Sequence, residues 1–256
     1  MIVREIPFRG GSLSYRITIP ENAGDNPCLV LVHGALSDSR FFHRQIHDLG
    51  KTYRIIAPDL PGHGRSSFSN WSGEDCIAAI SEIITREDAF SSVILAHSMA
   101  GPLVLHLCHR QPSVARGLVF VSTASRILLD EKMRDKIDRG NFSASDLTGV
   151  VFSGRMAEVA SHFLDTADPG FAGRLCNDLA LCDNTDAGGL CSEIAVPVLC
   201  IASADDLLIP STETCRLSES IPDSRMVMMD GSSHVPFLEN WRDFNGILRE
   251  YLRYLQ

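Results

Sequence analysis

Short hydrophobic runs recur along the chain and alternate with segments of helical periodicity. The runs are continuous and rich in Val, Ile and Leu, which is typical of strands buried on both faces of a sheet. Six such strands are expected, at CLVLVHG (28–34), YRIIAPD (53–59), SVILAHS (92–98), GLVFVST (117–123), VPVLCIAS (196–203) and SRMVMMDG (224–231). Two more are expected between residues 2 and 19, where a turn at Arg9-Gly10-Gly11 separates two strand patterns.

The segments between these runs favour helices. Their expected ranges are 39–49, 73–89, 99–111, 212–220 and 241–255. Strands that alternate with amphipathic helices imply right-handed βαβ units, and hence an α/β fold with a mostly parallel, eight-stranded sheet and helices on both faces. Ligands of such sheets bind at the carboxyl ends of the strands, so the loops there are the expected place of a functional site.

Residues 126–193 interrupt this alternation. They contain no convincing strand pattern, but three stretches have helical periodicity: RILLDEKMRDKI (126–137), RMAEVASHFLDT (155–166) and FAGRLCNDLALC (171–182). A helical insertion over an edge of the sheet would have this size. We therefore predict a core domain made of residues 1–125 and 194–256, with residues 126–193 inserted as a helical cap.

Composition and charge exclude several classes of function. The formal net charge of −9 argues against a nucleic-acid binder, because phosphate affinity needs a basic surface. Neither a signal peptide nor a run of ~18 apolar residues is found, so we expect a cytoplasmic protein without a membrane span. Eight cysteines without a CxxC pair predict no metal or redox site. The oligomeric state stays open.

Ser98 is the first candidate for chemistry. It stands in LAHSMAG (95–101), between a predicted strand and a predicted helix, which is the setting of a nucleophile elbow. The residues two before and two after such a serine must be small, and Ala96 and Ala100 meet that requirement where glycine is usual. A serine hydroxyl still needs a histidine to take its proton and a carboxylate to orient that histidine.

The two partners follow the last two predicted strands. Asp206 stands in IASADDLLIP and His234 in MDGSSHVPFLENW. Their order along the chain, after Ser98, is the order expected of a triad on this architecture. Asp205 competes with Asp206 for the role of the acid, and the position four residues before Pro210 favours Asp206.

Four motifs together resemble the α/β-hydrolase fold superfamily, in particular its small cytoplasmic esterase and lactonase branch. The four, which come in addition to the elbow, are the turn His33-Gly34-Ala35, the segment DLPGHGRS (59–66), the acid loop SADDLLIP (203–210) and the GSSH turn (231–234) with Glu239 after it. The resemblance covers nearly the whole chain. Departures are small residues in place of glycine at positions 96, 100 and 203.

The resemblance implies a mechanism without metal or organic cofactor. Ser98 would attack an acyl carbonyl, His234 would carry the proton and Asp206 would orient His234. The backbone N–H groups of Ala35 and Met99 would form the oxyanion hole. Water would then cleave the acyl-enzyme, which makes the expected substrate a small carboxylic ester.

Other residues near the motifs are weighed by their position. Leu36 and Met99 are the first candidates to line an acyl pocket. The other apolar residues beside the motifs are weaker candidates for the same pocket, since packing is the commoner role of such residues: Leu207, Val235 and Phe237. We expect structural roles for the remaining polar residues of the motifs, His33, Asp59, His63, Arg65 and His97.

The reaction itself has alternatives, because this fold hosts many chemistries. They are hydrolysis of a carrier-bound acyl ester or thioester, an enol-lactone or a carbon–carbon bond, and ligand reception without turnover. The insertion carries cations among acidic residues: Arg126, Lys132, Arg134, Lys136, Arg139 and Arg155. They form either a solvated, charge-mixed face or a docking face for an acidic substrate or acyl carrier protein.

Overall fold

The structure is a computed structural model that describes residues 1–21, 24, 26–68, 70–128, 131–139 and 170–256. One eight-stranded sheet runs through it in the order β1-β2-β4-β3-β5-β6-β7-β8. The strands are β1 Ile2–Phe8, β2 Gly11–Thr18, β3 Leu29–Val32, β4 Ile55–Pro58, β5 Ser92–His97, β6 Ala115–Val121, β7 Val198–Ser203 and β8 Ser224–Met229. The pairs from β4 to β8 are parallel, and β1 and β2 are antiparallel. The predicted fold class is confirmed.

The antiparallel edge is a hairpin. Phe8 pairs with Gly11, which leaves a two-residue loop of Arg9 and Gly10, both with positive φ. Positive φ at both loop positions matches the right-handed twist of the flanking strands. The predicted turn therefore lies where the sequence places it.

Two hydrophobic layers cover the sheet. Alternate residues of each central strand point to opposite faces. Leu29, Leu31, Val93 and Leu95 pack toward one face, and Val30, Val32, Ile94 and Ala96 toward the other. The first face is covered by α1 His43–Leu49, α9 Pro236–Glu239 and α10 Trp241–Tyr254, and the second by α2 Gly73–Arg86, α3 Ala100–Arg110 and α8 Ser211–Glu219. The central strands are therefore buried on both faces, as predicted.

Strand β8 departs from that expectation. It is the edge of the sheet, and only Met229 of its six residues is fully buried. Met228 is 43% exposed, because no strand lies beyond it. Its apolar run resembled a buried strand because sequence alone does not tell a central strand from an edge.

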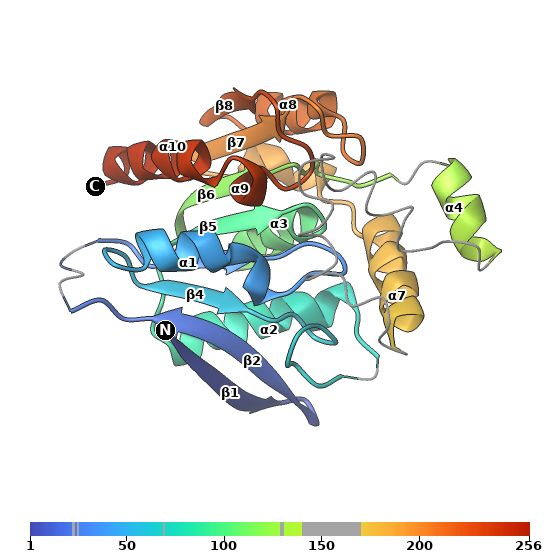
Figure 1. Ribbon diagram of the computed structural model, residues 1–256, viewed down its shortest axis with the longest axis horizontal. Helices are drawn as coiled ribbons and strands as arrows, with labels where there is room; N and C mark the ends of the chain where they lie inside the picture. Colours follow the sequence, from blue (N-terminus) through green and yellow to red (C-terminus); the bar gives the residue numbers. More distant parts are fainter. Residues whose placement is uncertain (22–23, 25, 69, 129–130, 140–169) are drawn as a thin grey trace.

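Helices α4 Glu131–Asp138 and α7 Phe171–Asn184 belong to the predicted insertion and lie beyond the carboxyl ends of β4 and β5 (Figure 1). The helical pattern at 155–166 falls outside the described residues. The described residues also contain short 3₁₀ turns: η1 Ser39–Phe42, η2 Pro112–Val114 and η3 Gly188–Glu193. No helix within the described part of the chain is long and apolar enough to cross a membrane.

Candidate active site

Ser98 occupies a strained turn between β5 and α3. Its φ is +51°, a left-handed conformation that a non-glycine residue adopts at a cost of roughly 1–3 kcal/mol. Neighbouring strands hold it there, because its N–H donates to the Val121 carbonyl (3.1 Å) and its carbonyl accepts from Thr123 Oγ1 (2.5 Å). The sharp turn expected of a nucleophile elbow is present at this serine.

The small residues around Ser98 differ in how closely neighbouring atoms approach them. Ala96 and Ala100 are both fully buried. Gly101 is tighter, since a Cβ on it would lie 2.2 Å from Thr123 Oγ1. The close approach of α3 to the loop after β6 therefore requires glycine at 101, whereas the turn accommodates alanine at 96 and 100.

His234 and Asp206 come together from the loops after β8 and β7. The His234 Nδ1 atom lies 2.9 Å from Asp206 Oδ2, and both side chains are buried. Asp206 Oδ1 accepts from the backbone N–H groups of Leu208 and Ile209, each at 2.9 Å. Burial would raise the pKa of Asp206, but His234 and these two amides outweigh it and hold that pKa below its usual value.

The resulting charge state sets the tautomer of His234. An ionised carboxylate can only accept hydrogen bonds, so the His234 Nδ1 atom carries the hydrogen. In the neutral ring this leaves Nε2 with a lone pair that can accept a proton. Asp205 is exposed and its backbone N–H donates to the Ser232 carbonyl. Asp206 is thus the carboxylate that contacts His234.

His97 connects His234 to the nucleophile's strand. The rings of His97 and His234 lie 4.7 Å apart, and His97 Nε2 donates to the His234 carbonyl at 2.9 Å. Burial and the nearby His234 lower the pKa of His97 to about 3, so His97 is neutral. Because His97 directly precedes Ser98, this hydrogen bond ties the His234 loop to the elbow.

The turn after β3 lies against the elbow. A Cβ on Gly34 would be 2.9 Å from the Ser98 Cβ, so this close approach also requires glycine. Within the described residues, neither the Ala35 nor the Met99 N–H is engaged in a backbone hydrogen bond. Met99 caps the N-terminus of α3, where backbone N–H groups favour negative charge.

His33 and Asp59 brace the loops around this turn. His33 Nε2 accepts from the Leu60 N–H at 3.0 Å, while Nδ1 donates to the Gly34 carbonyl at 2.8 Å. Burial and the neighbouring His63 lower the pKa of His33 to about 4, which agrees with a neutral ring. Asp59 accepts from the backbone N–H groups of Ser39 and Arg65. Both residues hold the loops in place, as the sequence led us to expect.

The residues weighed for an acyl pocket differ in exposure. Leu36 is half-buried, whereas the Met99 side chain is fully buried and packs in the core. Val235 and Phe237 are also fully buried, and Leu207 is 70% exposed. Contact with an acyl chain stays a prediction for Leu36 and Met99.

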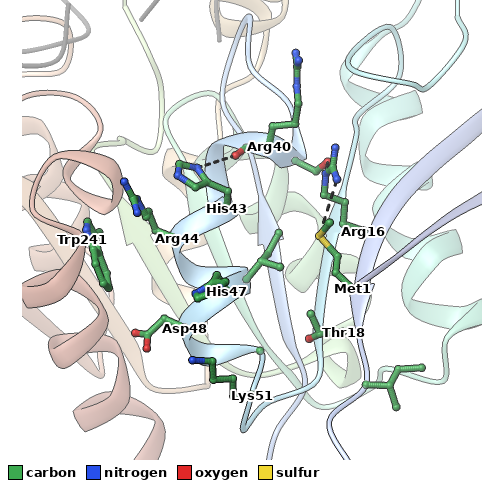
Figure 2. A pocket seen from close by; sticks show the side chains of 14 residues that line it. Met1, Arg16, Thr18, Arg40, His43, Arg44, His47, Asp48, Lys51 and Trp241 are labelled. Carbon is green, nitrogen blue, oxygen red and sulfur yellow. Dashed lines mark hydrogen bonds between the residues drawn. The ribbon is translucent and has the colours of Figure 1, made fainter. Parts of the chain in front are cut away.

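A pocket lies away from these residues. Figure 2 shows it along α1, beside β2 and Trp241. Its volume is about 670 Å³. Two of the arginines that line it interact with other residues. Arg40 forms an ion pair with Asp38, and the Arg44 guanidinium lies 5.5 Å from the centre of the Trp241 ring. Neither Ser98 nor the His234–Asp206 pair lines it, so it is separate from the candidate active site.

One buried acid near the site was not among the sequence candidates. Asp178, on α7, is fully buried, and its Oδ2 atom accepts from the Leu36 N–H (2.8 Å) and lies 2.9 Å from His63 Nε2. Its only signal is a carboxylate between apolar residues in CNDLALC, a pattern that equally suits the exposed face of a helix.

Comparisons with known proteins show which family and fold the chain is similar to. A family model for the alpha/beta hydrolase family matches residues 29–247. The chain is 28% identical over 244 residues to a pimeloyl-[acyl-carrier protein] methyl ester esterase of Neisseria meningitidis serogroup B, covering 87% of this chain and 91% of that protein. It is 27% identical over 256 residues to a putative carbamate hydrolase, RutD, of Yersinia enterocolitica, covering 91% and 89%. The enol-lactonase of Burkholderia xenovorans LB400 has the same fold, with a TM-score of 0.87 at 21% identity over 98% of this chain and 100% of that one.

Proposed function

Because the chain belongs to the alpha/beta hydrolase family, we propose that it hydrolyses small carboxylic esters through an acyl-enzyme on Ser98. The observation that carries the proposal is the left-handed turn at Ser98 with the buried His234–Asp206 pair joined to it through His97. A strained serine, a histidine with a free Nε2 and an ionised carboxylate are the parts that acyl transfer needs.

The first half of the reaction acylates Ser98. The His234 Nε2 atom takes the proton of the Ser98 hydroxyl as the oxygen attacks the ester carbonyl. The Asp206 carboxylate stabilises the imidazolium that forms. Negative charge on the carbonyl oxygen is received by the N–H groups of Ala35 and Met99. The imidazolium then gives its proton to the leaving alcohol as the carbon–oxygen bond breaks.

The second half repeats these steps with water. His234 takes a proton from the water molecule, whose oxygen attacks the acyl carbon, and the same two N–H groups receive the oxyanion. Proton return from His234 to Ser98 Oγ releases the carboxylic acid. Every proton and electron pair is accounted for by the ester, the water and these residues.

Hydrolysis of a carrier-bound acyl ester is the second candidate. It is favoured by relatives that act on a methyl ester of an acyl-carrier protein. In the described part of the insertion, Arg134 pairs with Asp183 and Arg139 with Asp135. A docking face for an acidic carrier therefore finds no support in these paired residues, and we rank it below the free ester.

A substrate panel tests both candidates. We expect wild-type protein to hydrolyse p-nitrophenyl esters of short acids, and Ser98→Ala to lose a factor on the order of 10⁴ to 10⁶ in kcat. Ser113→Ala, at an exposed serine in η2, is the matched control and should be unchanged. A methyl ester presented free and on an acyl carrier protein separates the candidates by their kcat/KM. Equal turnover by the Ser98→Ala protein would refute the mechanism.

A further inference from the structure

A buried ion pair joins α7 to the loop beside the candidate nucleophile. The Asp178 and His63 side chains are 0% and 1% exposed, and Asp178 Oδ2 lies 2.9 Å from His63 Nε2. The same oxygen accepts from the Leu36 N–H at 2.8 Å. One carboxylate oxygen thus contacts both the DLPGHGRS segment and the turn that follows β3.

The hydrogen bonds of His63 define its charge. Its Nδ1 atom lies 3.0 Å from the Pro61 carbonyl, which can only accept, so Nδ1 carries a hydrogen. Nε2 faces Asp178 Oδ2 and must donate as well if the carboxylate is ionised. A histidine that donates from both nitrogens is an imidazolium. Burial alone would lower the pKa of His63, but Asp178 outweighs burial and raises it.

The other ionisable groups around the pair agree with this assignment. The His33 ring lies 5.0 Å from the His63 ring and is neutral, because burial and His63 lower its pKa. Burial and the charge of Asp178 raise the pKa of the Cys76 thiol on α2, so that group is neutral too. Arg174 on α7 also lowers the pKa of His63, but less than burial does and less than Asp178 and the Pro61 carbonyl raise it.

Leu36 connects the Asp178–His63 pair to the candidate active site. Its φ is +55°, which is unfavourable for a leucine by roughly 1–3 kcal/mol. The hydrogen bond from its N–H to Asp178 restrains that backbone directly. Leu36 follows Ala35, whose N–H is a proposed oxyanion donor, and Gly34 lies against Ser98. The Leu36 N–H belongs to the Ala35–Leu36 peptide, so a shift at Leu36 passes through Ala35 to the adjacent Gly34–Ala35 peptide, which carries the donor.

We propose that Asp178, ionised and paired with protonated His63, is a positioning residue for the oxyanion hole: through it α7 holds the Ala35–Leu36 turn in the active conformation. The inference rests on the proposed function. Stability is a weak reason for such a pair, because desolvation of two buried charges offsets much of their attraction. Its contact with a strained loop residue gives it a role in geometry.

Substitution of Asp178 by asparagine tests the proposal. An amide of the same size cannot accept from both Leu36 N–H and His63 Nε2–H while balancing the imidazolium charge. We expect kcat for a p-nitrophenyl ester to fall about 10- to 100-fold with KM within threefold, because a displaced oxyanion donor acts on the transition state. Asp183→Asn, on the same helix but paired with exposed Arg134, is the matched control and should be unchanged.

Two further measurements separate positioning from a merely structural role. Nitrogen-15 spectra of the histidine rings should show His63 as an imidazolium at pH 7 in wild type and as a neutral ring in Asp178→Asn. Because the folded pKa is raised above 6.5, the pair is complete at lower pH and is lost as pH rises through that folded value. Wild-type kcat should fall as the pH rises through that folded pKa, and the Asp178→Asn protein should lack this decrease.

The possible failures are distinguishable. An inactive wild-type protein would refute the proposed function and, with it, the role of Asp178. An active wild type with unimpaired, folded Asp178→Asn would refute the role of Asp178 alone. A neutral His63 in wild type at pH 7 would refute the ion pair whatever the activity.

Discussion

Replacing Gly34 with alanine should lower ester turnover about 100-fold and leave the chain folded. A Cβ on Gly34 would lie 2.9 Å from both the Ser98 Cβ and His97 Nδ1, whereas ordinary contact begins at 3.4 Å. One side must therefore move by about 0.5 Å. Movement of the elbow displaces the nucleophile, and movement of the turn displaces the Ala35 N–H, so either response changes the reacting geometry.

The size of the effect follows from the geometry of oxyanion binding. Donors act at about 2.7–3.1 Å from the oxyanion, and loss of one donor costs about 10²- to 10³-fold in kcat. A misplacement of about 1 Å costs about 10²-fold. Whichever side moves, the separation between the nucleophile and the donor changes by about half that distance, and this misplacement together with the weakened donor contact gives our value of about 100-fold. The added methyl group should cost about 1–3 kcal/mol of stability, as overpacking does elsewhere.

The assay is steady-state hydrolysis of p-nitrophenyl acetate by protein whose folding is checked by circular dichroism and thermal melting. Gly246→Ala is the matched control, because a Cβ at that exposed position of α10 meets nothing within 4 Å. It should keep full activity and gain about 0.5–1 kcal/mol in stability. A Gly34→Ala protein with kcat within threefold of wild type would show that the turn does not bear on the nucleophile.

Two further predictions concern carboxylates. Asp206→Asn should lower kcat by about 10⁴-fold, because the wrong tautomer of His234 is then favoured. The same change at exposed Asp205 should leave kcat unchanged. The two variants are compared by steady-state kinetics, and the reverse result would exchange the roles of the two residues. Burial would raise the pKa of Glu87, but hydrogen bonds from Tyr15 and Arg4 outweigh burial and lower that pKa. The ionised Glu87 carboxylate therefore stabilises the fold at a pH above its unfolded pKa, and this stabilisation is lost as the pH falls through its folded pKa. Urea unfolding at pH 7, 5 and 3 should show a shallower acid decline for Glu87→Gln, and parallel curves would contradict the assignment.

The elements that follow from periodicity were predictable from sequence. All eight strands and the five core helices appear close to their expected ranges. Helix α9 was not predicted, because its four residues are too few for a periodic pattern. The ends of strands also moved: β4 occupies 55–58 within the expected 53–59, since pairing with β2 and β3 rather than composition sets its length.

The residues of the candidate site were likewise predictable only where a local sequence pattern marks them. The nucleophile, acid and histidine motifs were visible because each is a local pattern after a strand. Asp178 was not, because its partners His63 and Leu36 lie 115 and 142 residues away in sequence. The requirement for glycine at 101 also depends on Thr123, a residue of another strand's loop. Contacts of this kind are set by tertiary packing, which a local pattern does not encode.

Three of the six non-glycine residues with positive φ in the described part of the chain lie at the same edge of the sheet as these motifs. Leu36, Ser98 and Ser122, which follow the neighbouring strands β3, β5 and β6, all have positive φ although none is glycine. The backbone N–H of each donates a hydrogen bond to a different acceptor. The acceptors are the Asp178 carboxylate for Leu36, the Val121 carbonyl for Ser98 and the Ile201 carbonyl for Ser122. Such conformations persist only where the surroundings over-determine them. The core supplies that restraint at Ser98 and Ser122, whereas at Leu36 it comes from α7, so this helix takes part in shaping the edge where we place catalysis.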